Sequence, residues 1–376
     1  MKRYSRLKAG LSSVILCFAA ACGGASNHDV AAPAEVETIA EFDAAIDGLE
    51  HRAGFIDLYV DADNGRILAA LPTPNDDGVA LRFIYATGLT AGLGSNPVGL
   101  DRGAFDAGSI VAFRKIGDKV VAEQENWHYR ASADRDLERR AVRQSFAPSF
   151  LWSGDIAATH DDGRVLVDIS SFLTRDHFGV AATLKNHPRG GAYKRAEDRS
   201  FVDGDAALAF PDNVEFDAFL TFISSDPGVE PSTTAADGRA VTLVQHHSFV
   251  RLPAPGFKSR AFDPRTGAIE VAHYDFSAPL DEPIIRRIAR RFRLEREDPA
   301  AASGPVKKPI VFYVDPGAPE QIRDALIDGA MWWRDAFEAA GFEDAYRVEL
   351  LPEGAHPFDI RYNMIQWVHR QTRGWS

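Results

Sequence analysis

Residues 54–72, "GFIDLYVDADNGRILAALP", predict a β-hairpin, and most of the fold prediction extends from this pattern. Two arms rich in apolar side chains flank an Asp-Asn-Gly turn at 63–65, and Asn and Gly tolerate the positive φ angles that tight turns require. The letters "DADNG" at 61–65 also resemble the start of a calcium loop. However, the glycine comes one residue early and Pro72 stands where the bidentate glutamate belongs, so the turn is favoured.

Further stretches have the same β-strand composition, and short turn segments separate them. Many short strands at close spacing favour an antiparallel sheet, sandwich or open barrel over an α/β fold. The predicted strands are 79–87, 109–116, 118–129, 164–170, 214–224, 240–252 and 268–276. The predicted helices are 39–50, 133–144 and 283–292.

The last of these helices is predicted from its start signals and its periodicity. Asp281 occupies the N-cap position and Pro283 the first turn, while Ile284, Ile288 and Phe292 recur along one side. The segment is also rich in arginine. Because the chain is acidic overall, we interpret these arginines as a solvated face paired with nearby carboxylates, and not as a membrane or nucleic-acid surface.

The sequence pattern changes near residue 309. "KPIVFYVD" at 308–315 is a continuous apolar run, typical of a strand buried on both faces. A helix is predicted at 319–340, where apolar side chains recur every three or four residues and Gly341 follows the last turn. Strands at 346–351 and 358–370 complete a β-α-β-β order, and the first two strands are predicted to be parallel.

The chain is therefore predicted to be an α+β protein with two folded parts. A β-rich antiparallel domain at 38–294 precedes an α/β part at 309–376, and both have enough apolar residues for a core. Charged residues with Pro, Ala and Gly replace any periodic pattern at 295–308, which predicts a linker. Residues 23–37 are small and polar, which predicts a flexible tether.

The N-terminal residues have the features of an export signal. Basic residues precede an apolar run that is too short to span a bilayer, and the run ends in "FAAAC" at 18–22. This ending resembles the lipobox of bacterial lipoproteins, although it lacks the usual leucine. Residues 1–22 are predicted to be a lipoprotein-type signal peptide with Cys22 lipidated, which anchors the protein in the cell envelope, at the outer membrane or the periplasmic face. An ordinary secretory signal is the alternative.

Composition limits the possible chemistry of the mature chain. Both cysteines, Cys17 and Cys22, lie in the signal segment, which leaves no disulfide, thiol nucleophile or cysteine metal site. Removal of residues 1–21 takes away four positive charges, so the formal charge changes from -12 to -16. Such a surface argues against binding to nucleic acid or anionic lipid. The oligomeric state stays open.

Two local motifs contain residue types that occur in binding sites. In "GLGSNPVG" at 92–99, Pro97 takes the place of the third glycine of a dinucleotide fingerprint, and no Gly-Lys-Ser/Thr follows for a P-loop. His246 and His247 are adjacent on a predicted strand, so their side chains point to opposite faces and cannot easily share one metal ion. We predict a plain loop for the first motif and a structural role for the two histidines.

The region from 308 to 376 resembles the N-terminal half of a metzincin-like catalytic domain, and more closely a family of large bacterial secreted zinc-dependent metallopeptidases. The order strand, long helix with an aromatic pair, strand, and a strand opening on Asp-Ile carries the resemblance. It extends over about Val36–Ser376. Matching segments in the β-rich region are "LDRG" (100–103), "ERRAVRQSFAPSFLW" (138–152), "HHSFVRLP" (246–253), "FDPRTG" (262–267) and "APLDEPIIRR" (278–287).

In that family the chain continues into a further strand and a helix that carries His-Glu-x-x-His, whose histidines hold Zn²⁺ while the glutamate activates water. None of the eleven histidines here is followed by Glu-x-x-His. The resemblance therefore implies the front part of a zinc metalloendopeptidase, with a truncated catalytic half-domain at 309–376 that is inactive by itself. We predict no catalytic, cofactor-binding or metal-ligating residue in this chain; zinc and a peptide or protein substrate belong to the full-length family.

Three explanations fit such a truncation: an interrupted gene, an incomplete sequence, or a retained non-catalytic lipoprotein. The alternative function is a β-rich envelope lipoprotein that binds protein or polysaccharide without zinc chemistry. It requires an exposed aromatic platform, for which Trp127, Tyr129 and Trp152 are candidates. Aromatic residues among predicted strands are more often part of the core.

Overall fold

The computed structural model describes residues 37–371, and all of them fall in one compact unit. The predicted signal peptide 1–22 with its lipidation site Cys22, and the tether up to residue 36, lie outside the described residues. Helix α1 (Glu37–Ile46) begins at the last residue of the predicted tether. No helix of the described part is long and apolar enough to cross a membrane.

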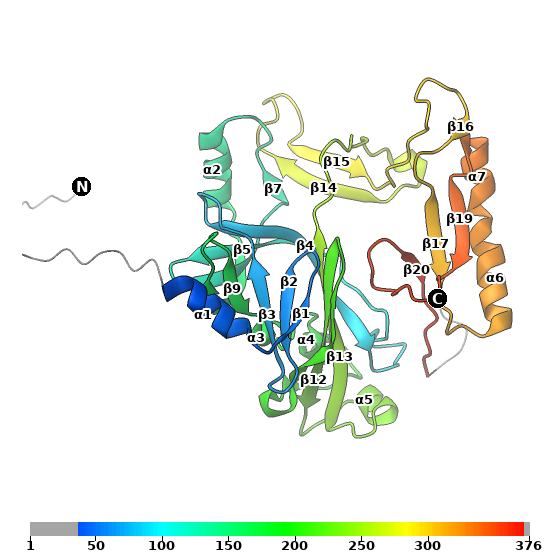
Figure 1. Cartoon of the computed structure of the whole chain (residues 1–376). Coiled ribbons are helices and arrows are strands. Elements are labelled where there is room, and N and C mark those ends of the chain that lie inside the picture. The colour runs from blue at the N-terminus through cyan, green and yellow to red at the C-terminus, as the bar shows by residue number, and fades with distance from the viewer. Residues whose placement is uncertain (1–36, 372–376) are drawn as a thin grey trace, which may run out of the picture. The chain divides into compact units, whose positions relative to one another are not determined.

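The protein is α+β and consists mostly of antiparallel sheet with a few helices (Figure 1). Its largest sheet has twelve strands in the order β1-β2-β3-β9-β8-β6-β5-β4-β13-β12-β10, and β11 pairs with β12. These strands are β1 (Glu50–Arg52), β2 (Asp57–Asp61), β3 (Arg66–Leu71), β4 (Val79–Ala91), β5 (Ser109–Ile116), β6 (Lys119–Gln124), β8 (Ser149–Thr159), β9 (Val165–Asp168), β10 (Lys194–Arg195), β11 (Phe201–Ala209), β12 (Asn213–Ile223) and β13 (Ala240–Arg251).

The predicted hairpin is confirmed as β2 and β3, paired from Asp57↔Ala70 to Asp61↔Arg66. Asp61, the first residue of the calcium-like motif, accepts hydrogen bonds from the side chains of Asn64 and Arg66. These bonds hold the pKa of the Asp61 carboxyl below its usual value, with Arg66 the largest contributor. The carboxylate that suggested an ion site therefore fixes the turn.

Short helices and aromatic side chains complete the core of the β-rich part. The helices are α2 (Asp136–Ser145), α3 (Ser170–Leu173), α4 (Val180–Asn186) and α5 (Val229–Thr234), besides the 3₁₀ turns η1 (Glu197–Arg199) and η2 (Pro264–Thr266). Phe249 of β13 is fully buried, and its ring contacts those of Phe83, Tyr85, Phe113, Phe172 and Phe216. Such aromatic contacts add to the free energy gained from burial alone.

The prediction of a helix at 283–292 is wrong. Its central residues form β15 (Ile285–Ala289), which pairs antiparallel with β14 (Glu270–Asp275) from Glu270↔Ala289 to Tyr274↔Ile285. The adjacent β-branched residues Ile284 and Ile285 favour a strand, because their side chains lose χ1 freedom in a helix. β14 also pairs in parallel with β7 (Tyr129–Arg130). Two of the arginines have the expected carboxylate partners: Arg286 pairs with Glu282 and Arg287 with Glu270. Arg291 instead donates to the carbonyl oxygen of Lys258.

The β-α-β-β order of the C-terminal part is confirmed. β17 (Ile310–Val314) pairs in parallel with β19 (Tyr346–Leu350) and with β20 (Asn363–Ile365). Between β17 and β19, helices α6 (Glu320–Met331) and α7 (Trp333–Ala339) lie along one face of this sheet (Figure 1). The predicted third strand is much shorter than expected, because residues on both sides of β20 make contacts with the β-rich part instead.

The predicted linker 295–308 contains a short strand and makes hydrogen bonds to the C-terminal part. Its residues form β16 (Gly304–Pro305), which pairs in parallel with β18 (Phe342–Glu343). Arg296 also donates a hydrogen bond to the carbonyl oxygen of Gly341. The segment is therefore built into the C-terminal part, and the domain boundary at this place stays a prediction.

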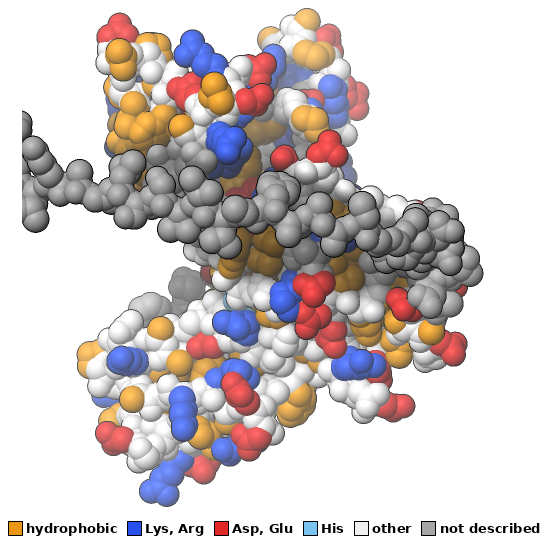
Figure 2. Space-filling view, turned by 90° about the vertical axis from the view of Figure 1, so that its left-hand side faces the viewer, with side chains coloured by type: hydrophobic (Ala, Val, Ile, Leu, Met, Phe, Trp, Pro, Cys, Tyr) orange, Lys and Arg blue, Asp and Glu red, His pale blue; other side chains and the backbone are white. Residues whose placement is uncertain are grey.

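The charged side chains on the described surface are mixed in sign. Figure 2 shows Lys and Arg side chains interspersed with Asp and Glu side chains over one face. Among the exposed ion pairs are Lys119 with Asp155 and Arg251 with Asp212. Exposed ion pairs of this kind contribute little to stability, and an interspersed pattern is typical of a solvated surface.

Candidate functional site

The two adjacent histidines of β13 point to opposite faces of the sheet, as the strand period predicts. His247 lies in the core. Its Nδ1 is 2.9 Å from the hydroxyl of Tyr85, and its Nε2 is 2.8 Å from the carbonyl oxygen of Leu173. Burial holds the pKa of His247 well below its ordinary value, so this imidazole is neutral. The structural role that we predicted fits His247.

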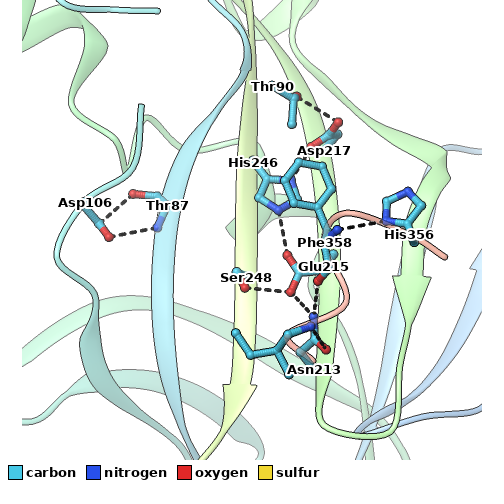
Figure 3. A network of polar contacts seen from close by, with 11 residues as sticks. Thr87, Thr90, Asp106, Asn213, Glu215, Asp217, His246, Ser248, His356 and Phe358 are labelled. Carbon is cyan, nitrogen blue, oxygen red and sulfur yellow. Dashed lines mark hydrogen bonds and ion pairs between the residues drawn. The ribbon is translucent and has the colours of Figure 1, made fainter. Parts of the chain in front are cut away.

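His246 lies on the outer face, between two carboxylates of β12 (Figure 3). Its Nδ1 is 2.6 Å from Oδ1 of Asp217, and its Nε2 is 2.7 Å from Oε2 of Glu215. Glu215 and Asp217 are two residues apart, so the strand places both on the same face. Antiparallel pairing sets His246 directly opposite Asp217. Since a carboxylate cannot donate, both ring nitrogens carry protons and the imidazole is a cation.

The charge of His246 is stable at neutral pH despite its burial. The side chain is only 2% exposed. Burial by itself lowers the pKa of His246, but the hydrogen bonds to Asp217 and Glu215 and the charges of both carboxylates raise it to about 9. The result is a cation enclosed by two anions in a water-poor environment.

The remaining carboxylate oxygens of this cluster also have partners. Oε1 of Glu215 accepts hydrogen bonds from Ser248 Oγ, at 2.7 Å, and from the side-chain amide of Asn213. Oδ2 of Asp217 accepts one from Thr90 Oγ1 at 2.9 Å. A buried polar network stabilises a unique arrangement only when its members are satisfied, and this one meets that condition.

A segment of the C-terminal part covers the cluster. The ring of Phe358 stacks on the imidazole of His246, with centroids 4.0 Å apart and planes 24° from parallel. Asn213 donates to the carbonyl oxygen of Phe358 at 2.7 Å, and the amide of Ile360 donates to Asn213 Oδ1 at 3.2 Å. On another side, the ring of Phe105 stands edge-on to His246, 5.8 Å away.

The close approach of Phe105 depends on the residue opposite His246 on β4. That residue is Gly88. An added Cβ at Gly88 would lie 2.6 Å from the ring of Phe105 and from the carbonyl oxygen of Ala104. Glycine is therefore required at this position for the aromatic wall of the cluster to form.

This arrangement limits the chemistry of His246. An imidazolium whose two N–H groups are both hydrogen-bonded can neither accept a proton nor ligate a metal. Among residues 37–371, no group of three or more His, Cys, Asp or Glu side chains is arranged to hold a metal ion. The zinc that the resemblance implies therefore has no fitting ligand set in the described chain. The favourable role for this cation is to bind the electron-rich face of an aromatic ring.

The three aromatic candidates do not form one platform. Trp152 is 6% exposed and belongs to the core. Tyr129 is half-buried, and its ring stacks on those of Phe146 and Tyr274, with centroids 4.0 and 5.0 Å away. Trp127 alone of the three is well exposed, at 46%, and it borders an open hollow of about 540 Å³.

The fold and the site thus define an α+β protein in which a charged histidine-carboxylate cluster is covered by a distant part of the same chain. The chain belongs to the family described as "Domain of unknown function (DUF5117)", whose family model matches residues 105–297. The matched segment includes His246 and its two carboxylate partners. Comparison with curated proteins and with solved structures finds no match.

Sequence reasoning missed the partners of His246. The signal that could have found them is the pair of acidic residues, two apart, inside the otherwise apolar strand "VEFDAFLTFI" at 214–223. An alternating acid pair is usually interpreted as the solvent face of a strand. Here the facing strand supplies a histidine, and Phe358 supplies the cover.

Proposed function

We propose that this chain is the N-terminal part of a cell-envelope, zinc-dependent metalloendopeptidase and that it hydrolyses no peptide by itself. The observation that carries the proposal is the C-terminal part, in which strand β17, the consecutive helices α6 and α7, strand β19 and strand β20 follow in this order. The three strands, β17, β19 and β20, are mutually parallel within one sheet. This order agrees with the resemblance to the front half of a metzincin-like catalytic domain.

In this proposal the β-rich part is an accessory domain. The zinc ligands belong to a His-Glu-x-x-His helix that lies outside residues 1–376, since these residues do not contain the motif. Bound zinc would supply the activated water for peptide hydrolysis. The present chain supplies the strands and helices that support such a site.

The proposal includes the cellular location. The lipobox-like "FAAAC" at 18–22 supports export, cleavage before Cys22 and a lipid anchor in the cell envelope. The net negative charge of the mature chain supports a protein or peptide substrate over nucleic acid.

The decisive experiment is to sequence the genomic DNA that follows codon 376. We expect a His-Glu-x-x-His codon run in one of the three frames within a further domain's length. A protein extended through that run should cleave casein and bind zinc stoichiometrically, and replacement of its motif glutamate by alanine should abolish cleavage. If no frame encodes such a motif, the peptidase proposal is wrong.

A second candidate function is a non-catalytic lipoprotein that binds polysaccharide, and the exposed Trp127 favours it. The indole Nε1 donates to Oε2 of Glu125 at 2.7 Å, which fixes the ring, and the hollow beside it is lined by the planar polar side chains of Gln124, Glu125 and Asn126. Aromatic faces beside planar hydrogen-bonding groups suit sugar rings.

This second function predicts co-sedimentation of the protein with insoluble cell-wall polysaccharide. Trp127→Ala should abolish the co-sedimentation, whereas Trp333→Ala, which removes another tryptophan with 64% exposure, should not. Equal binding by wild type and both variants, or binding by none, would contradict a sugar site at Trp127.

A further inference from the structure

The residues that precede and follow the short strand β20 both contact the β-rich part. Within residues 358–370, only Asn363–Ile365 pair with β17. Upstream of β20, Phe358 and Ile360 contact the outer face of β12 and β13 through His246 and Asn213. Downstream of β20, residues 366–371 contact the loop 92–103 that follows β4.

The downstream contact is made of several specific hydrogen bonds. Arg102 donates to the carbonyl oxygen of Trp367 at 2.9 Å, and Arg370 Nε donates to Oδ2 of Asp101 at 2.7 Å. The Asp101 side chain is only 7% exposed in this pair. The tail passes directly over Gly103, where an added Cβ would lie 2.5 Å from Oε1 of Gln366.

The loop that receives the tail is held by a buried carboxylate. Glu230 of α5 is 1% exposed, and it accepts hydrogen bonds from Ser95 Oγ and Arg189 Nε, both at 2.6 Å. These bonds lower the pKa of the Glu230 carboxyl. Its Oε2 also accepts a hydrogen bond from the side-chain amide of Gln371 at 3.0 Å. The motif "GLGSNPVG", predicted to be a plain loop, is therefore a receiving site for another part of the chain.

We infer that the β-rich part acts as a two-point clamp for segment 356–371, and that the charged His246 closes one of the two points. The two contacts lie on either side of β20, so neither the strand nor the chain that leads out of it can move while both are closed. Release of either point frees one end of β20, whose few pairings with β17 do not hold it alone. This inference rests on the proposed function where it assigns a role to the accessory domain, which is to fix the third strand of the catalytic part.

The groups around His246 determine the pH range in which Phe358 stacks on a charged imidazole. Glu215 and Asp217 approach from β12, Phe105 from the loop that follows β4, and Phe358 from the segment itself, while Thr90 of β4 donates to Asp217. His356 lies next to Phe358, with ring centroids 5.7 Å apart, and burial lowers its pKa, so it adds no positive charge at neutral pH. Loss of the His246 proton would leave Phe358 on a neutral ring and remove the cation–π attraction.

Hydrogen–deuterium exchange of the purified chain tests the clamp without any measurement of peptidase activity. Phe358→Ala opens the first point and Arg370→Gln the second. Either variant should raise exchange throughout 356–371, including the amides of β20, by about tenfold. Phe358→Ala removes the ring stacked on the charged imidazole, and Arg370→Gln removes a charge-assisted hydrogen bond to Asp101. Phe150→Ala and Arg265→Gln, which change side chains with 62% and 88% exposure elsewhere, are the matched controls and should leave this segment unchanged.

Protection of 214–223 and 240–251 in the same samples reports whether each variant is folded. A third variant, His246→Gln, should make exchange at 356–371 insensitive to alkaline pH, whereas the wild type should lose protection as pH rises from 7 to 10 after correction for intrinsic rates. If each substitution raises exchange only at its own contact and leaves β20 protected, the clamp is refuted. That outcome would leave the proposed peptidase untouched, since the DNA sequence tests it separately.

Discussion

Replacement of His246 by glutamine tests the charged cluster most directly. Glutamine is neutral and of similar length, so it fills much of the space while it removes the cation between Glu215 and Asp217. Glu215 is 1% exposed and would be left as an uncompensated anion beside a second carboxylate. Loss of one member of a buried ion pair typically costs about 3–5 kcal/mol.

The pKa of His246 gives an independent magnitude. The folded protein raises it from 6.5 to about 9. At 1.36 kcal/mol for each pKa unit, this rise corresponds to about 3 kcal/mol of stabilisation. Because the folded-state pKa is the higher one, the contribution is present in full below pH 6.5 and is lost as pH rises through 9. The wild-type free energy of unfolding should therefore fall by about 3 kcal/mol between these pH values.

Other histidines do not obscure this window. Burial and the charge of Arg175 lower the pKa of His177 to about 4, and burial holds the pKa of His247 well below its ordinary value. Groups with lowered folded-state pKa values reduce stability below pH 6.5, where the unfolded imidazoles take up protons. Their contribution levels off by about pH 7.5, roughly one unit above the unfolded-state pKa, so the slope between pH 7.5 and 9.5 reports His246.

Urea denaturation followed by circular dichroism between pH 6 and 9.5 measures the effect. His246→Gln should be about 3 kcal/mol less stable than wild type at pH 6.5 and should lack the decline up to pH 9. Combination with Glu215→Gln should recover part of the loss, because the second change removes the uncompensated anion. A variant as stable as wild type, or a wild type whose stability is flat across this window, refutes the view that His246 is a charged, stabilising group.

Three further predictions concern other parts of the chain. Phe249→Ala should destabilise the protein by about 3–5 kcal/mol in urea denaturation, because its ring is fully buried among five other aromatic rings, while Phe150→Ala should change stability by less than about 0.5 kcal/mol. Cys22→Ser should release the protein from the membrane fraction or leave the signal uncleaved, whereas Cys17→Ser should do neither; a wild-type protein that is soluble in the periplasm would contradict the anchor. Elemental analysis of the purified chain after dialysis against a weak chelator should find no stoichiometric zinc, and a tightly held ion would show a site that the described residues do not reveal.

Local pattern was enough to predict most of the β-rich part. The hairpin at 57–71 and strand β13 each have an apolar pattern bounded by turn residues, and both lie where the sequence predicts them. In segment 283–292, the helical spacing of Ile284 and Ile288 predicts a helix, whereas the structure has strand β15 there. Its partner is β14, the preceding strand, and the pairing of two segments cannot be derived from the spacing within one of them.

The candidate site could be predicted only in part, for the same reason. The opposite orientation of His246 and His247 follows from the strand period alone. The ion cluster requires the pairing of β13 with β12, and its cover requires Phe358, which lies in a different part of the sequence and on no regular strand. Acidic residues on one face of a strand are exposed unless another segment covers them, and one sequence does not specify that segment.

Burial of the charged cluster costs desolvation free energy, which suggests that the cluster provides specificity and not only stability. Well-packed apolar residues often give equal or greater stability than buried ion pairs of similar volume, since enclosing charges requires their desolvation. What an apolar surface lacks is specificity for the segment that covers it. The face of β12 and β13 offers a cation for a ring, and an amide, Asn213, that both donates to the carbonyl of Phe358 and accepts from the amide of Ile360. Only a segment with an aromatic side chain and backbone groups at matching spacing can contact all three groups: the His246 cation, the Asn213 donor and the Asn213 acceptor. The cluster therefore favours one register of segment 356–360 over its neighbours, and this register sets where β20 begins.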